Sequence, residues 1–191
     1  MFRTPRHLVV ALGLALALLG SAGSARADEI RPLSVVAPWE ITGLDPARSG
    51  YVFARLQIAE TLVTADDIGR PVASLAEGWT LSEDRLLWRF RLRPTAVFHD
   101  GTPVTAEAAV ASLRRARANA AGVLAGLPIA AIEAEPGAVT IRTERPFLSL
   151  PAFLAHSSTI VLAPAAYDAV GAVTAMIGTG PPTARPSSSP R

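Results

Sequence analysis

The sequence contains no cysteine and no lysine, and it has only three histidines and two methionines. The absence of cysteine excludes disulfide bonds, thiolate catalysis and lipid attachment to a cysteine within these 191 residues. All 18 basic residues are arginine, which we attribute to genomic base composition before any function. Long apolar runs are also scarce: the clearest has 12 residues, Leu8 to Leu19, and is too short for a comfortable membrane span.

A strong charge imbalance is missing as well, once the N-terminal segment is set aside. Three of the 18 basic residues and none of the 16 acidic residues lie in the first 27 positions. Residues 28–191 therefore carry 15 basic and 16 acidic residues, a net charge of −1. This balance indicates no basic surface for nucleic acid, so we expect no nucleic-acid partner.

Residues 1–27 have the pattern of a secretory signal peptide. Arg3 and Arg6 precede the apolar run, and Ala25-Arg26-Ala27 places small residues at the −3 and −1 positions of a cleavage site. We expect a mature chain that begins at Asp28; an uncleaved membrane anchor is the alternative. A cysteine-free exported chain is expected in the periplasm of a two-membrane bacterium.

The most strongly patterned stretch runs from Leu75 to Ser112. Apolar and charged residues alternate between Leu86 and Leu92, which predicts a strand that buries Trp88 and Phe90 on one face. The alternative is a platform of aromatic side chains, Trp79 and Phe98 included, on which a ligand stacks. Because the aromatic residues occur at the spacing of one strand face, burial in the core is favoured over ligand stacking.

A tight turn and a capped helix are predicted after this strand. Asp100-Gly101 supplies residue types that tolerate positive φ where the chain reverses. Thr105 is the predicted N-cap of a helix from Ala106 to about Asn119, and Glu107 lies in its first turn, where the helix dipole favours an anion.

These residues resemble a known family. Leu75-Ala76-Glu77-Gly78-Trp79 and Val97-Phe98-His99-Asp100-Gly101-Thr102-Pro103 are similar to the extracytoplasmic solute-binding proteins of peptide and nickel ABC importers, bacterial family 5. Shorter matches occur in the family's order at Leu44-Asp45-Pro46, Glu60-Thr61-Leu62-Val63, Leu150-Pro151 and Ile177-Gly178-Thr179-Gly180-Pro181. The sequence departs from the family at Ala59, where an aromatic is usual, at Arg85, where a glycine is usual, and after Pro181, where the match stops.

The resemblance implies a mixed α/β (α+β) chain with part of a type II periplasmic-binding-protein fold that lacks the second lobe. Residues 28–45 would form the first strand and loop of lobe I, residues 46–176 an α/β subdomain of lobe I, and residues 177–191 a truncated return segment with a disordered tail. The implied function is the substrate-binding component of an ABC importer for peptides or related solutes, here a fragment. No cofactor and no enzymatic activity are implied.

The predicted ligand-binding residues are Trp39, Glu40 and Ile41. They follow a predicted buried strand, Leu33–Ala37, and ligands of open α/β folds tend to lie beyond the C-terminal ends of strands. In the family this loop lies at the cleft, and its backbone can line an extended peptide. An ordinary surface loop is the alternative. The implied partners are a small solute (an oligopeptide, a dipeptide or a nickel complex) and an ABC permease of the inner membrane.

Further elements are expected from local patterns. They are a helix at Ala47–Ala59, strands at Leu62–Thr64 and Ile160–Leu162, a hairpin of Ile129–Ala134 with Val139–Thr143, and short helices at Phe147–Ala155 and Ala165–Val170.

A second functional interpretation is a small exported hydrolase or metal-handling protein built on His99, Asp100 and His156. A histidine beside an aspartate can orient a general base or complete a metal site. A turn residue that bonds its own backbone explains His99 more simply. Ser157-Ser158 lacks a nucleophile elbow, and Gly178-Thr179-Gly180 lacks the lysine of a phosphate loop. A third interpretation is a frameshifted fragment without binding activity.

Overall fold

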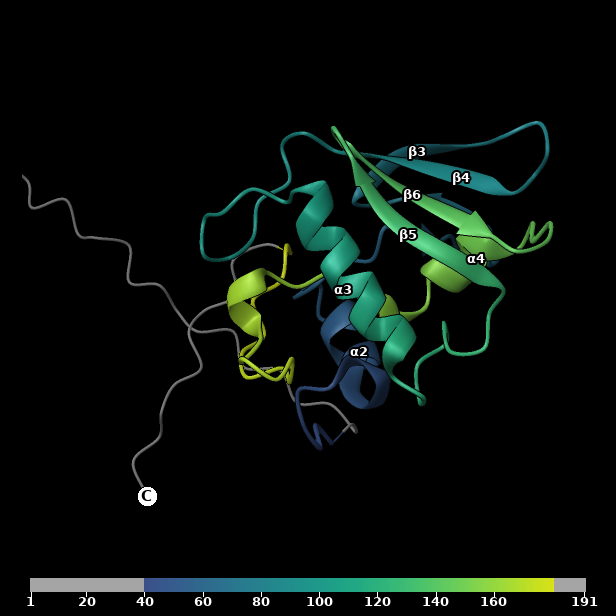
Figure 1. Cartoon of the computed structure of the whole chain (residues 1–191). Coiled ribbons are helices and arrows are strands. Elements are labelled where there is room, and N and C mark those ends of the chain that lie inside the picture. Colours follow the sequence, from purple (N-terminus) through teal and green to yellow (C-terminus); the bar gives the residue numbers. More distant parts are fainter. Residues whose placement is uncertain (1–39, 181–191) are drawn as a thin grey trace, which may run out of the picture. The chain divides into compact units, whose positions relative to one another are not determined.

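The computed structural model describes residues 40–180. These residues form a mixed α and β structure, as predicted, in which helices lie beside a four-stranded antiparallel sheet (Figure 1). The helices are α2 (Pro46–Arg55), α3 (Ala106–Ala118) and α4 (Leu150–Leu154), with the 3₁₀ turns η1 (Ser157–Thr159) and η2 (Pro164–Ala166). The strands are β1 (Val63–Ala65), β2 (Pro71–Ala73), β3 (Ala76–Leu81), β4 (Leu87–Leu92), β5 (Ile129–Glu135) and β6 (Ala138–Thr143).

Several expectations fall outside the described residues. These are the signal peptide with cleavage before Asp28, the strand Leu33–Ala37, the binding-loop residue Trp39, and the tail after Gly180. Within residues 40–180, the helices are all too short or too polar to cross a membrane.

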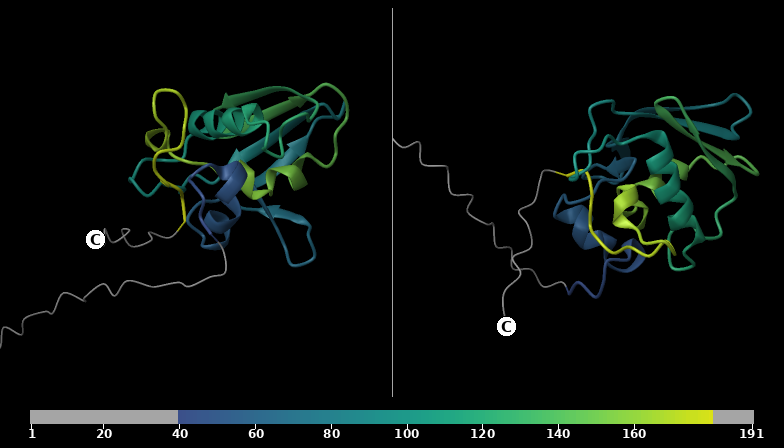
Figure 2. Two further views of the ribbon diagram at one scale, coloured as in Figure 1. Left: turned by 90° about the horizontal axis from the view of Figure 1, so that it is seen from below. Right: turned by 60° about the vertical axis from the view of Figure 1, so that its left-hand side comes forward.

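The sheet has the strand order β3-β4-β6-β5, with every neighbouring pair antiparallel. Trp88 and Phe90 of β4 are 6% and 0% exposed and stack with ring centroids 6.2 Å apart, while Arg89 is exposed. The predicted phase of this strand is therefore confirmed. The hairpin of β5 and β6 is confirmed too, with Gly137 at φ +68° in its turn. The ribbon of β1 and β2 extends away from the sheet (Figure 2).

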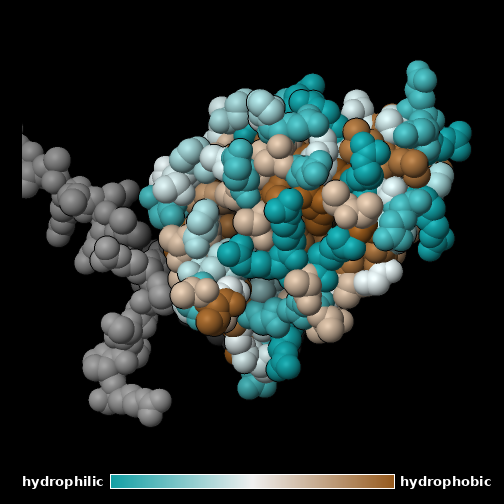
Figure 3. Space-filling view, viewed as in Figure 1, coloured by the Kyte–Doolittle hydropathy of each residue, from teal (hydrophilic) through white to brown (hydrophobic). Residues whose placement is uncertain are grey.

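Helix α3 packs on the sheet through an apolar stripe that includes Ala109, Val110 and Leu113. Its predicted cap is confirmed, because the Thr105 hydroxyl accepts a hydrogen bond from the Ala108 amide at 3.2 Å. The backbone amide of Glu107 and the Thr105 hydroxyl hold the pKa of Glu107 below its ordinary value. Polar side chains dominate the face in Figure 3, and apolar residues are visible in recesses between them.

Helix α2 ends at Arg55, so the predicted extension to Ala59 is wrong. Gln57 adopts φ +56°; its amide donates to the Ala54 carbonyl and the Ile58 amide donates to the Phe53 carbonyl. This pair of bonds is a Schellman motif, which ends a helix and usually has glycine at the left-handed position. A glutamine at that position is a weak sequence signal, which is why the helix end was not predicted.

The segment from Ile160 to Leu162 is buried but forms no strand, contrary to expectation. The Val161 amide donates to the Glu60 carbonyl, and the Leu162 amide donates to the Ser112 hydroxyl. These bonds go to separate segments instead of one neighbouring strand. Helix α4 occupies only part of the predicted Phe147–Ala155, and of the predicted Ala165–Val170 helix only Ala165 and Ala166 are helical, within η2.

Candidate functional site

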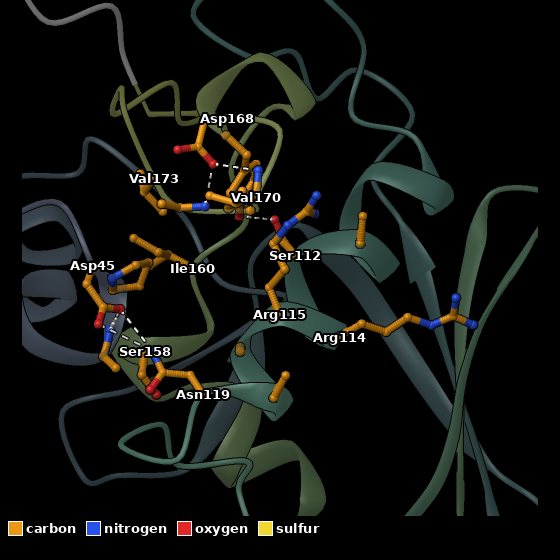
Figure 4. Close-up of a pocket in the computed structure, with 18 of the residues that line it drawn as sticks. Asp45, Ser112, Arg114, Arg115, Asn119, Ser158, Ile160, Asp168, Val170 and Val173 are labelled. Atoms are coloured by element: carbon orange, nitrogen blue, oxygen red, sulfur yellow. Dashed lines mark hydrogen bonds between the residues drawn. The ribbon is translucent and has the colours of Figure 1, made fainter.

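A cavity of about 960 Å³ opens beside α3 (Figure 4). Its walls come from the start of α2, the outer face of α3, the segment from Ser158 to Ile160, and the hairpin Tyr167–Val173. Four separate segments therefore build it, and their side chains converge only in the folded chain. Small and apolar residues form much of the lining, among them Pro46, Ala111, Ala116 and Ile160. A cavity of this size is in the usual range for small-molecule sites.

One end of the cavity is built where two helix ends meet. Asp45 is the N-cap of α2, and its carboxylate accepts a hydrogen bond from the Ala47 amide at 3.0 Å. Asn119, the C-cap of α3, donates its side-chain amide to both carboxylate oxygens of Asp45, at 3.1 and 3.3 Å. The contact therefore links the start of α2 to the end of α3, and the Asp45 carboxylate accepts three hydrogen bonds from two protein nitrogens.

Tyr167 forms the other end. Its hydroxyl lies 2.9 Å from the Ser112 hydroxyl, and the Arg115 guanidinium carbon lies 4.1 Å from the centre of its ring. Burial raises the pKa of Tyr167, while the Ser112 hydrogen bond and the Arg115 charge act in the opposite direction. Tyr167 is therefore a neutral phenol at neutral pH.

The hairpin Tyr167–Val173 closes this end as a short turn. The Asp168 carboxylate accepts hydrogen bonds from the Val170 and Ala172 amides at 3.0 and 2.8 Å. Gly171 has φ +87°, a conformation that glycine adopts without strain. Val170, at the tip, is 89% exposed. The hairpin therefore forms one wall of the cavity and carries the exposed apolar side chain of Val170 at its tip.

Of the predicted binding loop, Glu40 and Ile41 precede the cavity in the chain and do not line it. Glu40 and Ile41 are exposed, Ile41 by 50%, and Trp39 lies outside the described residues. Asp45, four residues after Ile41, is the first lining residue. The binding role of Trp39, Glu40 and Ile41 therefore stays a prediction. Sequence reasoning did not single out the cavity residues Ser112, Arg115, Asn119 and Tyr167 as functional.

The alternative centre at His99 has a different environment. Asp100 accepts hydrogen bonds from the Thr102 hydroxyl and amide, which lower its pKa, so the predicted turn is confirmed. His99 does not bond its own turn: its amide donates to the Gly178 carbonyl at 2.9 Å, and its Nε2 lies 3.0 Å from the Gly180 carbonyl oxygen. A neutral carbonyl acceptor requires Nε2 to carry the proton.

His156 also bonds nearby backbone, because its Nδ1 accepts from the Ser158 amide at 3.1 Å. His156 is thereby the cap of η1. Within residues 40–180, no three side chains of the His, Cys, Asp and Glu types gather closely enough to hold a metal ion. Both histidines within residues 40–180 thus form hydrogen bonds with backbone groups.

The segment held by His99 is packed tightly on its other side. A Cβ atom on Gly178 would lie 2.1 Å from the Ile58 carbonyl oxygen, and one on Gly180 would lie 1.4 Å from the Gln57 carbonyl oxygen. The Gly180 amide donates to the Ile58 carbonyl at 3.2 Å. The glycines of Gly178-Thr179-Gly180 therefore permit a close backbone approach that any side chain would prevent.

Comparison with protein families gives a match over residues 70–181, to the family described as bacterial extracellular solute-binding proteins, family 5 middle. The glutathione-binding protein GsiB of Escherichia coli (strain K12) is 32% identical over 186 residues, which are 92% of this chain and 35% of GsiB. The probable peptide ABC transporter periplasmic-binding protein y4tO of Sinorhizobium fredii is 33% identical over 130 residues, 66% of this chain and 24% of y4tO.

Solved structures agree with these sequence matches. A nickel ABC transporter structure from Bacillus halodurans has a TM-score of 0.63 at 32% identity, covering 72% of this chain and 29% of that one. NikA from Brucella suis, in complex with Fe(III)-EDTA, has a TM-score of 0.61 at 27% identity, covering 68% and 28%. The chain thus spans between about a quarter and a third of the length of these proteins.

Proposed function

Because the chain belongs to the bacterial extracellular solute-binding proteins of family 5, we propose that it is part of the substrate-binding component of an ABC importer. Its described residues are a partial type II periplasmic-binding fold, as the solved neighbours show. The named relatives bind glutathione or belong to peptide and nickel transporters. The solute of this chain is accordingly a peptide, glutathione-like molecule or nickel complex, and its downstream partner is an ABC permease.

The single observation that carries this proposal is the family match over residues 70–181, which contains most of the cavity wall. Solute rests against α3 and the hairpin Tyr167–Val173, and the loop of Trp39, Glu40 and Ile41 adds backbone hydrogen bonds at the adjoining edge. No covalent step is required. The domain division proposed from the sequence, with boundaries after residues 27, 45 and 176, remains part of this proposal.

An NMR titration of the ¹⁵N-labelled chain tests this function. Glutathione and a tripeptide mixture are added separately, and we expect saturable shifts of amides around the cavity, such as those of Ser112 and Gly171. A third titration with Ni²⁺ tests the metal-handling alternative. Asn119→Ala should weaken binding because it removes the contact between Asn119 and Asp45. His99→Gln is the matched control and should leave binding within a few-fold. Ester or peptide hydrolysis, or metal binding that His99→Gln abolishes, would support the hydrolase or metal-handling alternative instead.

Family membership also supports a periplasmic location, since y4tO is described as a periplasmic-binding protein. We propose that residues 1–27 direct export and are removed, so that the mature protein starts at Asp28. N-terminal sequencing of protein recovered from the periplasm measures this directly. Recovery of exported protein that still begins at Met1 would refute the cleavage site.

A further inference from the structure

Four residues with carboxylate or guanidinium side chains line the cavity: Asp45, Arg114, Arg115 and Asp168. Both carboxylates already have protein donors. Asp45 accepts from the Ala47 amide and the Asn119 side chain, and Asp168 accepts from two amides of its own hairpin. A carboxylate that already accepts two or three hydrogen bonds has less capacity left for a ligand.

Arg114 also has hydrogen-bond donors occupied by the protein. Its Nε and Nη2 both donate to the Ile132 carbonyl of β5, at 3.0 and 2.6 Å. Figure 4 shows its side chain extending away from the other labelled residues. Arg114 therefore binds the backbone of the edge strand β5, and its guanidinium does not face the centre of the cavity.

Arg115 differs from these three residues. Its guanidinium stacks on the Tyr167 ring, and among residues 40–180 it takes part in no hydrogen bond and has no carboxylate within 4.0 Å. Stacking uses the face of the guanidinium plane and leaves the N–H groups at its edge available. A Cβ atom on Gly171 would lie 3.7 Å from the Arg115 Nε, so the group lies beside the hairpin as well as over the Tyr167 ring. Arg115 is thus a cation with unused donors at the cavity.

We propose that Arg115 binds an anionic group of the solute, so that the cavity selects small molecules with a carboxylate or phosphate group. This inference rests on the proposed solute-binding function and names the chemical class of the solute. A guanidinium edge matches a carboxylate or phosphate with two parallel hydrogen bonds. The apolar part of the solute contacts Ala111, Ala116 and Ile160, which line the same cavity.

A helix dipole offers a competing explanation for Arg115, which lies in the last turn of α3, where a cation is favourable without any ligand. Arg117 provides the comparison. It lies in the same turn but does not line the cavity. If the dipole alone explains Arg115, substitutions of Arg115 and Arg117 will have equal effects on anion binding.

The experiment uses three probes with the same five-carbon chain: glutarate, its neutral diamide, and 1,5-diaminopentane. Each is titrated into the ¹⁵N-labelled chain at constant ionic strength, and the amide shifts of Ser112, Ala116 and Gly171 are followed. We expect glutarate to bind most tightly. Arg115→Gln should weaken glutarate binding about five-fold, the range for an exposed ion pair, and Arg117→Gln should leave it unchanged.

Two results would overturn the inference alone, and a third would overturn the proposed function with it. Equal affinity for the three probes, or equal effects of Arg115→Gln and Arg117→Gln, would remove the anion selectivity while leaving the proposed function intact, provided that the peptide or glutathione titration still gives saturable shifts. If none of those solutes nor any five-carbon probe shifts the cavity amides, the proposed function fails together with the inference. The amide spectrum of each variant, compared with that of the unaltered chain, establishes that it is folded.

Discussion

At the residue scale, two residues other than glycine adopt the left-handed backbone conformation that usually requires glycine. Gln57 and Arg85 have φ +56° and +60°. Gln57 ends α2 in the Schellman motif, and Arg85 lies in the turn between β3 and β4, where the family resemblance leads one to expect glycine. Left-handed geometry costs a residue with a Cβ atom roughly 1 kcal/mol or more. The chain therefore keeps its turn geometry at these positions despite unfavourable residue types.

Gly178 illustrates the opposite case, a glycine whose lack of a side chain is essential. We predict that Gly178→Ala lowers the free energy of unfolding by about 1–3 kcal/mol, the usual cost of overpacking. The reason is the 2.1 Å separation between the new Cβ and the Ile58 carbonyl oxygen. Gly78→Ala is the control, because nothing lies within 4 Å of a Cβ there, and it should change stability by less than about 1 kcal/mol. Equal denaturant midpoints for the two variants would contradict the close approach.

We predict that His99 has a structural role and does not bind solute. His99→Gln should leave solute binding within a few-fold, because a glutamine amide can still donate toward the Gly180 carbonyl that His99 Nε2 contacts. The measurement is the NMR titration with glutathione, with His99→Ala as the comparison, in which hydrogen exchange of the Gly180 amide should accelerate. Loss of a bound metal ion in His99→Gln would instead favour the metal-handling interpretation.

At the element scale, strand β4 supplies the clearest stability prediction. Trp88→Ala should cost about 3–5 kcal/mol, a large share of the stability of an ordinary domain. Trp88 is 6% exposed and stacks on Phe90, and within residues 40–180 its indole nitrogen has no hydrogen-bond partner, so the loss is one of packing. Arg89→Ala, on the opposite face, removes only the exposed ion pair with Glu135 and should cost less than about 1 kcal/mol. Chemical denaturation compares them, and an unchanged midpoint for Trp88→Ala would refute the burial.

The elements that sequence reasoning predicted well are those with strong local signals. Alternation specifies the phase of β4, and a threonine cap with an acidic first turn specifies the start of α3. The end of α2 was not predictable, because its Schellman motif has glutamine in place of glycine. Strand β2 is only three residues long and was also missed. Ile160–Leu162 looked like a strand because buried extended segments share one apolar pattern, whatever their hydrogen-bond partners.

The candidate site was less predictable than the fold, for a physical reason. Its lining comes from four segments, between Asp45 and Val173, that meet only through tertiary packing. Asp45 belongs to Leu44-Asp45-Pro46, one of the short matches to the family. Tyr167 and Arg115 carry no local pattern that distinguishes a cavity residue from a surface one. The binding residues predicted from the sequence were Trp39, Glu40 and Ile41, and the two of these that the structure describes, Glu40 and Ile41, precede Asp45 in the chain without lining the cavity.

At the scale of the whole molecule, length limits what the cavity can do. The chain spans about a third of GsiB and about a quarter of y4tO. Binding proteins gain affinity by covering most of a small ligand's surface. The described cavity offers a solute one uncommitted guanidinium, a few backbone groups and a partly apolar wall. The proposed function therefore assigns to the described residues one side of a site.

We accordingly predict that this chain alone binds solutes weakly. Each hydrogen bond to solute contributes only about 0.5–1.5 kcal/mol net in water. Association costs about 4 kcal/mol or more in lost translational and rotational freedom, so a few such contacts leave a dissociation constant of about a millimolar at best. Calorimetry of residues 28–191 with a peptide library, glutathione and Ni²⁺ measures this, on a sample shown by circular dichroism to unfold cooperatively. A dissociation constant of about a micromolar or lower would mean that these residues already form a complete binding module, since affinity of that order requires a solute enclosed on most sides.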